Sequence, residues 1–389
     1  MIANNKHFIP AFLLFGFIVN AQQSNDSIDI SIRPYTSLRG HLAMHDKVME
    51  LQENASRAGI EINLKKGNIA FVAGVELQIN MFKGNSSFNV DGNLDSDLLT
   101  IVSEQKQQVF GNRLGYLGID LSKYGKITFG KQWSVYRDVT AYTDRFNVFG
   151  GRASATFTGG TDGGMLGTGR ADQSIIYRNK IKAFQFGAQI QTKGGNDDKI
   201  IDGFGFSAQL ELNQNISIGA AFTRAFIAQN LIDDNHILGL SGHPTFYSIG
   251  SKYTSKQFDV SLLGILQQNG DFTPISYQSE NTINPSYVFD AKGFETAMKY
   301  KLNKFSILGG YNLYVPETKK SVENISIDKK FRRSDLITGL EYYPMKYVQL
   351  YTEQRISFGK NYAGKKEQSV FTLGMKLDLS RQFNKKLNL

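Results

Sequence analysis

The sequence predicts an all-β protein, a transmembrane antiparallel β-barrel of about 16 strands with a third extracellular loop that folds inward. Two observations support this fold class. From residue 28 onward, apolar residues recur with a period of two, which places them on one face of a pleated strand. The connections between these stretches alternate between short turns and long polar loops, which is typical of membrane-spanning barrels.

The N-terminal segment has the features of a signal peptide. Lys6 precedes an apolar run over residues 8–19, and the run ends at Val19-Asn20-Ala21, with small residues where signal peptidase cleaves. The run is shorter than the roughly 20 residues that a spanning helix needs, which disfavours the alternative of a membrane anchor. We therefore expect residues 1–21 to be removed and residues 22–389 to form one barrel domain.

Long alternating stretches supply the strands. Residues 28–44, 68–83 and 203–212 all alternate, and the second of them carries its apolar set at Ile69, Phe71, Ala73, Val75, Leu77, Ile79 and Met81. A closed cylinder pairs every backbone N–H and C=O group with a neighbouring strand, as hydrocarbon requires. The apolar face would then contact lipid and the polar face would line a lumen. This arrangement explains how a chain with a mean hydropathy of -0.29 can lie in a membrane.

Seven short turns and eight longer loops connect the strands, and together they give sixteen strands with both termini at the short-turn end. The short turns fall at residues 65–68, 122–125, 179–180, 213–215, 254–257, 302–304 and 344–346. The loops fall near residues 45–55, 84–106, 139–169, 194–202, 228–242, 269–288, 316–331 and 359–367. A large soluble sandwich or propeller would also alternate, but it would not separate its connections into two such length classes.

The loop over residues 139–170 is rich in glycine and has neither a helix period nor a strand period. Loops of this length without secondary structure are usually functional or disordered. A sixteen-stranded barrel is wide enough to enclose an aqueous channel, which would pass any solute smaller than its bore. We therefore expect this loop to bend into the lumen and narrow it.

Short motifs follow one another between residues 112 and 179. They are Asn112-Arg113-Leu114-Gly115-Tyr116-Leu117-Gly118, Phe129-Gly130-Lys131, Tyr142-Thr143-Asp144, Phe149-Gly150-Gly151, Gly169-Arg170 and Tyr177-Arg178-Asn179. In this order they resemble the general diffusion porins of Gram-negative outer membranes. The resemblance implies a trimer in outer-membrane lipid that lets small hydrophilic solutes and ions diffuse passively, without a cofactor and without enzymatic activity.

The resemblance also implies a set of pore residues. In porins that look like this, acidic groups on the third loop face arginines on the opposite wall. Carried over by position, the acid is Asp144 and the wall residues are Arg57, Arg113 and Arg170, with Arg39 as a fourth. Such facing charges create a transverse field that orients water and favours polar permeants. The alternative is that these arginines are ordinary salt-bridge partners or exposed loop charges.

Strand parity supports part of this set independently. Arg57 lies on the face opposite Ala58 and Ile60, as a lumen residue should. Arg113 instead shares its parity with Leu117 and Ile119, which we expect to face lipid.

The loop also departs from the family pattern in its charge. Asn147-Val148 stands where related porins often place Pro-Glu, so one acidic group is missing. The loop carries Arg145 and Arg152 as well. If these side chains reach the lumen, positive charge exceeds negative charge at the constriction, which predicts a modest preference for anions.

Other functional classes have little support. The histidines lack cysteines and a repeated metal-ligand spacing, so we expect no metal site. The glycine run at 163–169 lacks the Lys-Ser/Thr of a phosphate-binding loop. The net charge of +9 is spread along the chain, which argues against nucleic-acid binding. One alternative stays open: a barrel plugged by its loop that serves as a structural or docking subunit of a larger outer-membrane assembly.

Overall fold

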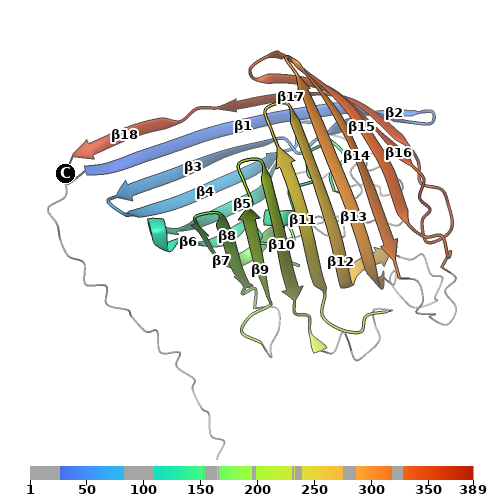
Figure 1. The fold of residues 1–389 in the computed structure, drawn as a ribbon, viewed down its shortest axis with the longest axis horizontal. Coiled ribbons are helices and arrows are strands. Elements are labelled where there is room, and N and C mark those ends of the chain that lie inside the picture. The colour runs from blue at the N-terminus through green and yellow to red at the C-terminus, as the bar shows by residue number, and fades with distance from the viewer. Residues whose placement is uncertain are drawn as a thin grey trace, which may run out of the picture.

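The computed structural model describes residues 27–82, 109–151, 153, 164, 166–194, 199–229, 232, 239–274, 286–317 and 327–388. These residues form one antiparallel sheet that closes on itself into a barrel (Figure 1). Its strands are β1 (Ser27–His45), β2 (Val48–Glu53), β3 (Arg57–Lys66), β4 (Ile69–Ile79), β5 (Phe110–Asp120), β6 (Lys126–Trp133), β7 (Arg170–Ile181), β8 (Phe184–Gln191), β9 (Gly203–Glu211), β10 (Ile216–Ala225), β11 (Thr245–Thr254), β12 (Phe258–Pro274), β13 (Ser286–Leu302), β14 (Phe305–Pro316), β15 (Arg333–Met345), β16 (Val348–Ser357), β17 (Val370–Ser380) and β18 (Phe383–Asn388). Two short helices, η1 (Ser122–Tyr124) and α1 (Arg137–Thr140), complete the described elements.

The eighteen strand segments correspond to sixteen barrel strands, because two of these strands are interrupted. β2 and β3 pair with successive parts of β1 and together form the second barrel strand. β17 and β18 pair with successive parts of β1 on its other side and form the last barrel strand. Because β1 thus pairs with both its successor and the end of the chain, the sheet has no free edge along the body of the barrel. The predicted sixteen-stranded antiparallel barrel is confirmed.

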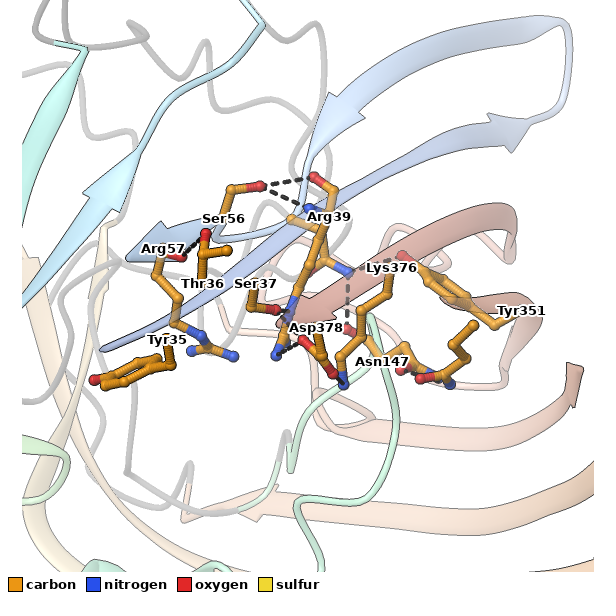
Figure 2. A network of polar contacts seen from close by, with 12 residues as sticks. Tyr35, Thr36, Ser37, Arg39, Ser56, Arg57, Asn147, Tyr351, Lys376 and Asp378 are labelled. Atoms are coloured by element: carbon orange, nitrogen blue, oxygen red, sulfur yellow. Dashed lines mark hydrogen bonds and ion pairs between the residues drawn. The ribbon is translucent and has the colours of Figure 1, made fainter. Parts of the chain in front are cut away.

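The gap between β2 and β3 is bridged by a side chain. The Ser56 hydroxyl accepts the backbone N–H of Arg39 at 2.8 Å and donates to the Arg39 carbonyl oxygen at 3.0 Å (Figure 2). These two bonds replace the ladder where Ala55 adopts a φ of 53°. The chain can therefore bend between β2 and β3 without leaving backbone groups of β1 unpaired.

Most short turns lie at or beside their predicted positions, and one prediction is wrong. The turn expected at 179–180 lies at Lys182-Ala183, because β7 continues to Ile181. Ile181 pairs with Phe184, and both side chains are exposed on the outer surface. The polar pair Asn179-Lys180 therefore belongs to the strand rather than to the turn.

The two faces of the barrel differ as the alternation predicts. Large apolar side chains cover the outside, among them Phe71 at 58% exposure and Ile249 at 68%. Charged and polar side chains such as Glu295, Gln267 and Glu353 point inward and are buried. Within the part of the chain that the structure describes, no helix is long and apolar enough to cross a membrane.

Candidate functional site

The segment that follows β6 lies against inward-facing side chains of the wall. Asp138 of α1 accepts hydrogen bonds from Arg178 of β7 at 3.0 Å and from Ser207 of β9 at 2.8 Å. The Tyr142 hydroxyl donates to Gln209 Oε1, also on β9, at 2.7 Å. Burial, followed by the charge of Asp138, raises the pKa of the Tyr142 phenol to about 12, so this donor keeps its proton.

Two buried glutamates hold the middle of the same segment. Glu353 of β16 accepts the backbone N–H groups of Asn147 at 2.5 Å, Val148 at 2.9 Å and Phe149 at 3.4 Å. Glu295 of β13 accepts the N–H of Ala153 at 2.9 Å and the hydroxyl of Thr143. Each carboxylate thus satisfies backbone donors that a loop without secondary structure cannot pair internally.

Apolar packing and a close contact between Gly151 and Glu295 also hold the loop segment against the wall. Val148 and Phe149 pack with Ile337 and Tyr351 in one buried cluster. Gly151 lies so near Glu295 that a Cβ at this position would stand 2.5 Å from Oε2, so a larger residue would displace this carboxylate. The described residues of the segment therefore lie along the inner face of β7 to β16.

Cationic side chains gather on the wall formed by the two ends of the chain. Arg39 of β1, Arg57 of β3, Arg113 of β5 and Lys376 of β17 lie with two acids, Glu76 of β4 and Asp378 of β17, and we call these six residues the basic cluster. Figure 2 shows the guanidinium groups of Arg39 and Arg57 next to each other, with Lys376 and Asp378 beside them. The cluster holds two more positive than negative charges.

The two acids of the basic cluster are fully engaged. Arg113 Nε donates to Glu76 Oε1 at 2.7 Å, and the Tyr35 hydroxyl donates to Glu76 Oε2 at 2.9 Å. Lys376 Nζ lies 2.9 Å from Asp378 Oδ2, whereas the Arg39 guanidinium is 3.9 Å from the same carboxylate.

Arg57 differs from the other cations of the cluster. Its carbonyl oxygen accepts a hydrogen bond from Thr36. Its guanidinium has no hydrogen-bond or ion-pair partner among the described residues (Figure 2). This half-buried guanidinium belongs to a lumen-facing position of β3, and no described residue uses its N–H donors.

The tip of the loop reaches the basic cluster. Asn54, three residues before Arg57, donates through Nδ2 to the Asn147 carbonyl oxygen and to the Tyr351 hydroxyl, both at 2.9 Å. Gln349 Nε2 donates to Asn147 Oδ1 at 3.1 Å. The loop and the wall that carries the cations therefore meet at Asn147, which places the basic cluster beside the loop tip.

A β-bulge places Arg113 in this cluster despite its parity. The pairing of β4 with β5 shifts between Glu76 and Leu77, so β5 contains one extra residue there. The bulge turns Arg113 inward, where its side chain is 6% exposed against Glu76. Leu117 and Ile119, which share its parity, remain on the outer face.

The remaining predicted residues lie on the loop side. Asp144 accepts from Arg137 Nη2 at 2.8 Å, so the loop acid is neutralised by its own loop. Arg145 donates through Nε to the Tyr142 carbonyl oxygen at 2.9 Å. Arg170 is buried on β7, with its Cζ 5.6 Å from the Trp133 ring, on which Arg137 also stacks at 3.7 Å. Arg152 lies outside the described residues.

The structure thus brings Arg39, Arg57 and Arg113 together and places Arg170 apart from them. Sequence reasoning did not select six residues that shape the site, namely Glu76, Arg137, Glu295, Glu353, Lys376 and Asp378. For the strand residues among them a signal existed, since a charged residue with lumen parity in a membrane strand is informative. Among the described residues there is no group of His, Asp and Glu side chains that could hold a metal ion.

Comparisons with known proteins agree with this geometry. A family model described as Gram-negative porin matches residues 35–354. The outer membrane porin PhoE of Klebsiella pneumoniae is 26% identical over an alignment that covers 75% of this chain and 82% of that protein. Two solved structures share the fold. OmpT of Vibrio cholerae in its trimer form has a TM-score of 0.60 at 16% identity, covering 90% of this chain and 99% of that one. The anion-selective porin from Comamonas acidovorans has a TM-score of 0.61 at 13% identity, covering 90% and 100%.

Proposed function

Since the chain belongs to the Gram-negative porin family, we propose that it forms a water-filled channel through the outer membrane with a modest preference for anions. Small hydrophilic solutes and ions would diffuse through it passively. The described part of the third loop and the basic cluster form the two sides of its constriction. Asp144, Arg145, Arg39, Arg57, Arg113 and Arg170 line or support this passage, and Arg152 is included by its position on the loop.

The observation that supports anion preference is an imbalance in pairing. Arg57, Arg145 and Lys252 have no acidic partner among the described residues; Lys252 lies over the Tyr142 ring at 4.6 Å. The acids of the basic cluster and the loop acid are each matched by a cation, in the pairs Glu76 with Arg113, Asp378 with Lys376 and Asp144 with Arg137. Glu295 and Glu353 instead accept backbone N–H groups of the loop. Unmatched positive charge in a narrow passage raises the local concentration of anions.

Two of the related proteins support further parts of the proposal. An anion-selective porin shares the fold, which is consistent with a preference for anions in this architecture. A relative of the same fold has been solved in a trimer form, and we infer that this chain also assembles as a homotrimer. The large apolar side chains on the outer surface are suited to contact both lipid and neighbouring copies.

Reversal potentials across a planar lipid bilayer test the proposal. The purified protein is inserted between chambers of unequal KCl concentration, and the expected potential has the sign for chloride moving faster than potassium. Clear cation selectivity would overturn the anion preference and leave the channel intact. Absence of any stable conductance would overturn the channel itself and favour a structural or docking subunit of a larger outer-membrane assembly.

A further inference from the structure

Two tyrosines of the inner wall lie over glycines of neighbouring strands, and one of them, Tyr35, lies beside Arg57 (Figure 2). A Cβ built on Gly59 would stand 2.4 Å from Tyr35 Cζ, and one on Gly74 would stand 2.6 Å from Tyr116 Cζ. Both glycines occupy lumen-facing positions, so those Cβ atoms would point into the lumen. The phenol end of each ring therefore lies over a glycine of the neighbouring strand. We call Tyr35 and Tyr116 the tyrosine shelf.

The strand register places the tyrosine shelf directly beside the basic cluster. Tyr35 is paired with Gly59, which is paired in turn with Glu76 on β4. One rung further toward the short turns, Gly74 is paired with Tyr116 on β5. Arg57 precedes Gly59 by two residues on the same face of β3, so its guanidinium lies one rung toward the loop from the Tyr35 ring.

Hydrogen bonds fix the shelf to the cations. The Tyr35 hydroxyl and Arg113 bind the two oxygens of the same carboxylate, Glu76. Arg33 Cζ lies 5.3 Å from the centroid of the Tyr35 ring, and the Arg33 guanidinium lies 2.6 Å from Glu61. Tyr35 is thus held in place by paired charges, while the Arg57 guanidinium beside it has no acidic partner among the described residues.

We propose that the tyrosine shelf and Arg57 form a binding subsite for cyclic sugar acids, the uronates, on their way through the channel. This inference rests on the proposed function, because the subsite lies in the passage. The flat C–H face of a pyranose ring packs on a tyrosine face, as apolar ring surfaces do on aromatic side chains. The carboxylate of the same solute takes N–H donors of Arg57 that no described residue binds, in the fork geometry that guanidinium groups favour.

The surrounding groups favour a sugar ring over a purely aromatic acid. Glu61 and Glu76 border the two rings, and each of their oxygens, although bound once by the protein, keeps a second lone pair that a sugar hydroxyl can bind as a donor. An open-chain acid of equal charge lacks the flat ring, and a neutral sugar lacks the carboxylate. Both should therefore bind less tightly than a uronate.

Current recordings with three probes test this subsite. Glucuronate, gluconate and glucose are added separately to single channels in a planar bilayer, and the half-saturating concentration for current reduction is measured. We expect glucuronate to act at a concentration about fivefold lower than gluconate, because stacking of one ring contributes about this factor. Glucose should reduce the current only in proportion to its effect on bulk conductivity. Equal half-saturating concentrations for glucuronate and gluconate overturn the subsite while leaving the channel established.

Substitutions separate the ring contribution from general effects. Tyr116→Leu should remove the advantage of glucuronate over gluconate, and Tyr116→Phe should retain it, because no hydrogen bond of the Tyr116 hydroxyl is part of the proposal. Gly74→Ala should act like Tyr116→Leu, since the new Cβ displaces the ring from the wall. Tyr343→Leu is the matched control, because Tyr343 faces the lumen on β15 away from the shelf, where it donates to Glu341. Loss of the advantage in Tyr343→Leu, or its persistence in Tyr116→Leu, contradicts the assignment.

Discussion

The backbone N–H of Val148 donates to Glu353 Oε2 at 2.9 Å and so joins the loop to a strand that lies 205 residues later in the chain. Glu353 is fully buried and also accepts the N–H groups of Asn147 and Phe149. A single carboxylate thus pairs three successive backbone donors of a segment that has no sheet or helix partners there. This attachment holds the loop tip beside the basic cluster, and we expect it to determine how wide the proposed passage can open.

Replacing Glu353 should widen and loosen the passage. In Glu353→Ala the three N–H groups lose their acceptor, and each unpaired buried donor costs about 1–3 kcal/mol unless water reaches it. Detachment of the loop from β16 relieves this cost. We therefore expect a larger single-channel conductance and more current noise, measured in a planar bilayer at fixed salt concentration.

Asp259→Asn is the control for this variant. Asp259 is a lumen-facing acid on β12 that pairs with Lys301 at 2.7 Å and has no contact with the loop among the described residues. Its replacement should leave conductance and noise unchanged. If Glu353→Ala behaves like the control, Glu353 does not hold the loop in place.

The barrel could be predicted from the sequence because its strands carry a strong local pattern. Ile69, Phe71 and Val75 alternate with residues that face water, and this pattern requires no knowledge of distant partners. The turn at Lys182-Ala183 was misplaced because Asn179 and Lys180 are polar for a different reason, namely their position near the end of a strand. Polarity alone does not separate a strand end from a turn.

The proposed constriction was less predictable because its contacts join residues far apart in the chain. Arg57 followed from parity, but the bulge that turns Arg113 inward has no local signature, and parity alone placed this residue on the lipid face. The carboxylates that hold the loop, Glu295 and Glu353, could be recognised as lumen residues but not assigned to the loop. An irregular segment has no period from which its partners can be derived.

Gly130 should not tolerate a side chain. Its φ of 124° lies in a region that residues other than glycine rarely adopt, and a Cβ there would stand 2.1 Å from the Gly115 carbonyl oxygen. We expect Gly130→Ala to lower the free energy of unfolding by about 3 kcal/mol, the upper range for one strained backbone position. Denaturant titration in detergent, followed by the fluorescence of the single tryptophan, measures this change.

Gly309→Ala provides the comparison on another strand. The nearest atom to a Cβ at Gly309 is Met298 Cε at 3.7 Å, which is ordinary contact, so this variant should unfold like the parent. Equal stability of the two alanine variants would show that the backbone of β6 adapts at Gly130.

The ion pair between Arg113 and Glu76 should contribute to stability because both side chains are buried, with exposures of 6% and 9%. A double-mutant cycle with Arg113→Met and Glu76→Gln should give a coupling energy of roughly 2 kcal/mol, as for hydrogen bonds between charged groups. The pair of Arg33 and Glu61 has side-chain exposures of 44% and 40%. The same cycle there should give about 0.5 kcal/mol, because solvent screens exposed pairs. A coupling at Arg113 no larger than at Arg33 would show that water in the lumen screens both pairs equally.

Selectivity should depend on the cations that have no acidic partner among the described residues, and not on the total charge of the chain. Arg57→Gln, Arg145→Gln and Lys252→Gln each remove one unmatched charge near the loop, and each should lower the chloride-to-potassium permeability ratio derived from the reversal potential. Lys180→Gln removes one charge as well. Lys180 is exposed and lies 2.6 Å from Glu211, and salt in solution already screens the electric field of such an exposed charge. This control should leave the ratio close to that of the parent.

Each of the three variants should lose part of its effect as salt rises from 0.1 M to 1 M, because the Debye length shortens from about 10 Å to about 3 Å. A shift in Lys180→Gln as large as in Arg57→Gln would mean that net charge, and not the pairing at the constriction, determines which ions pass.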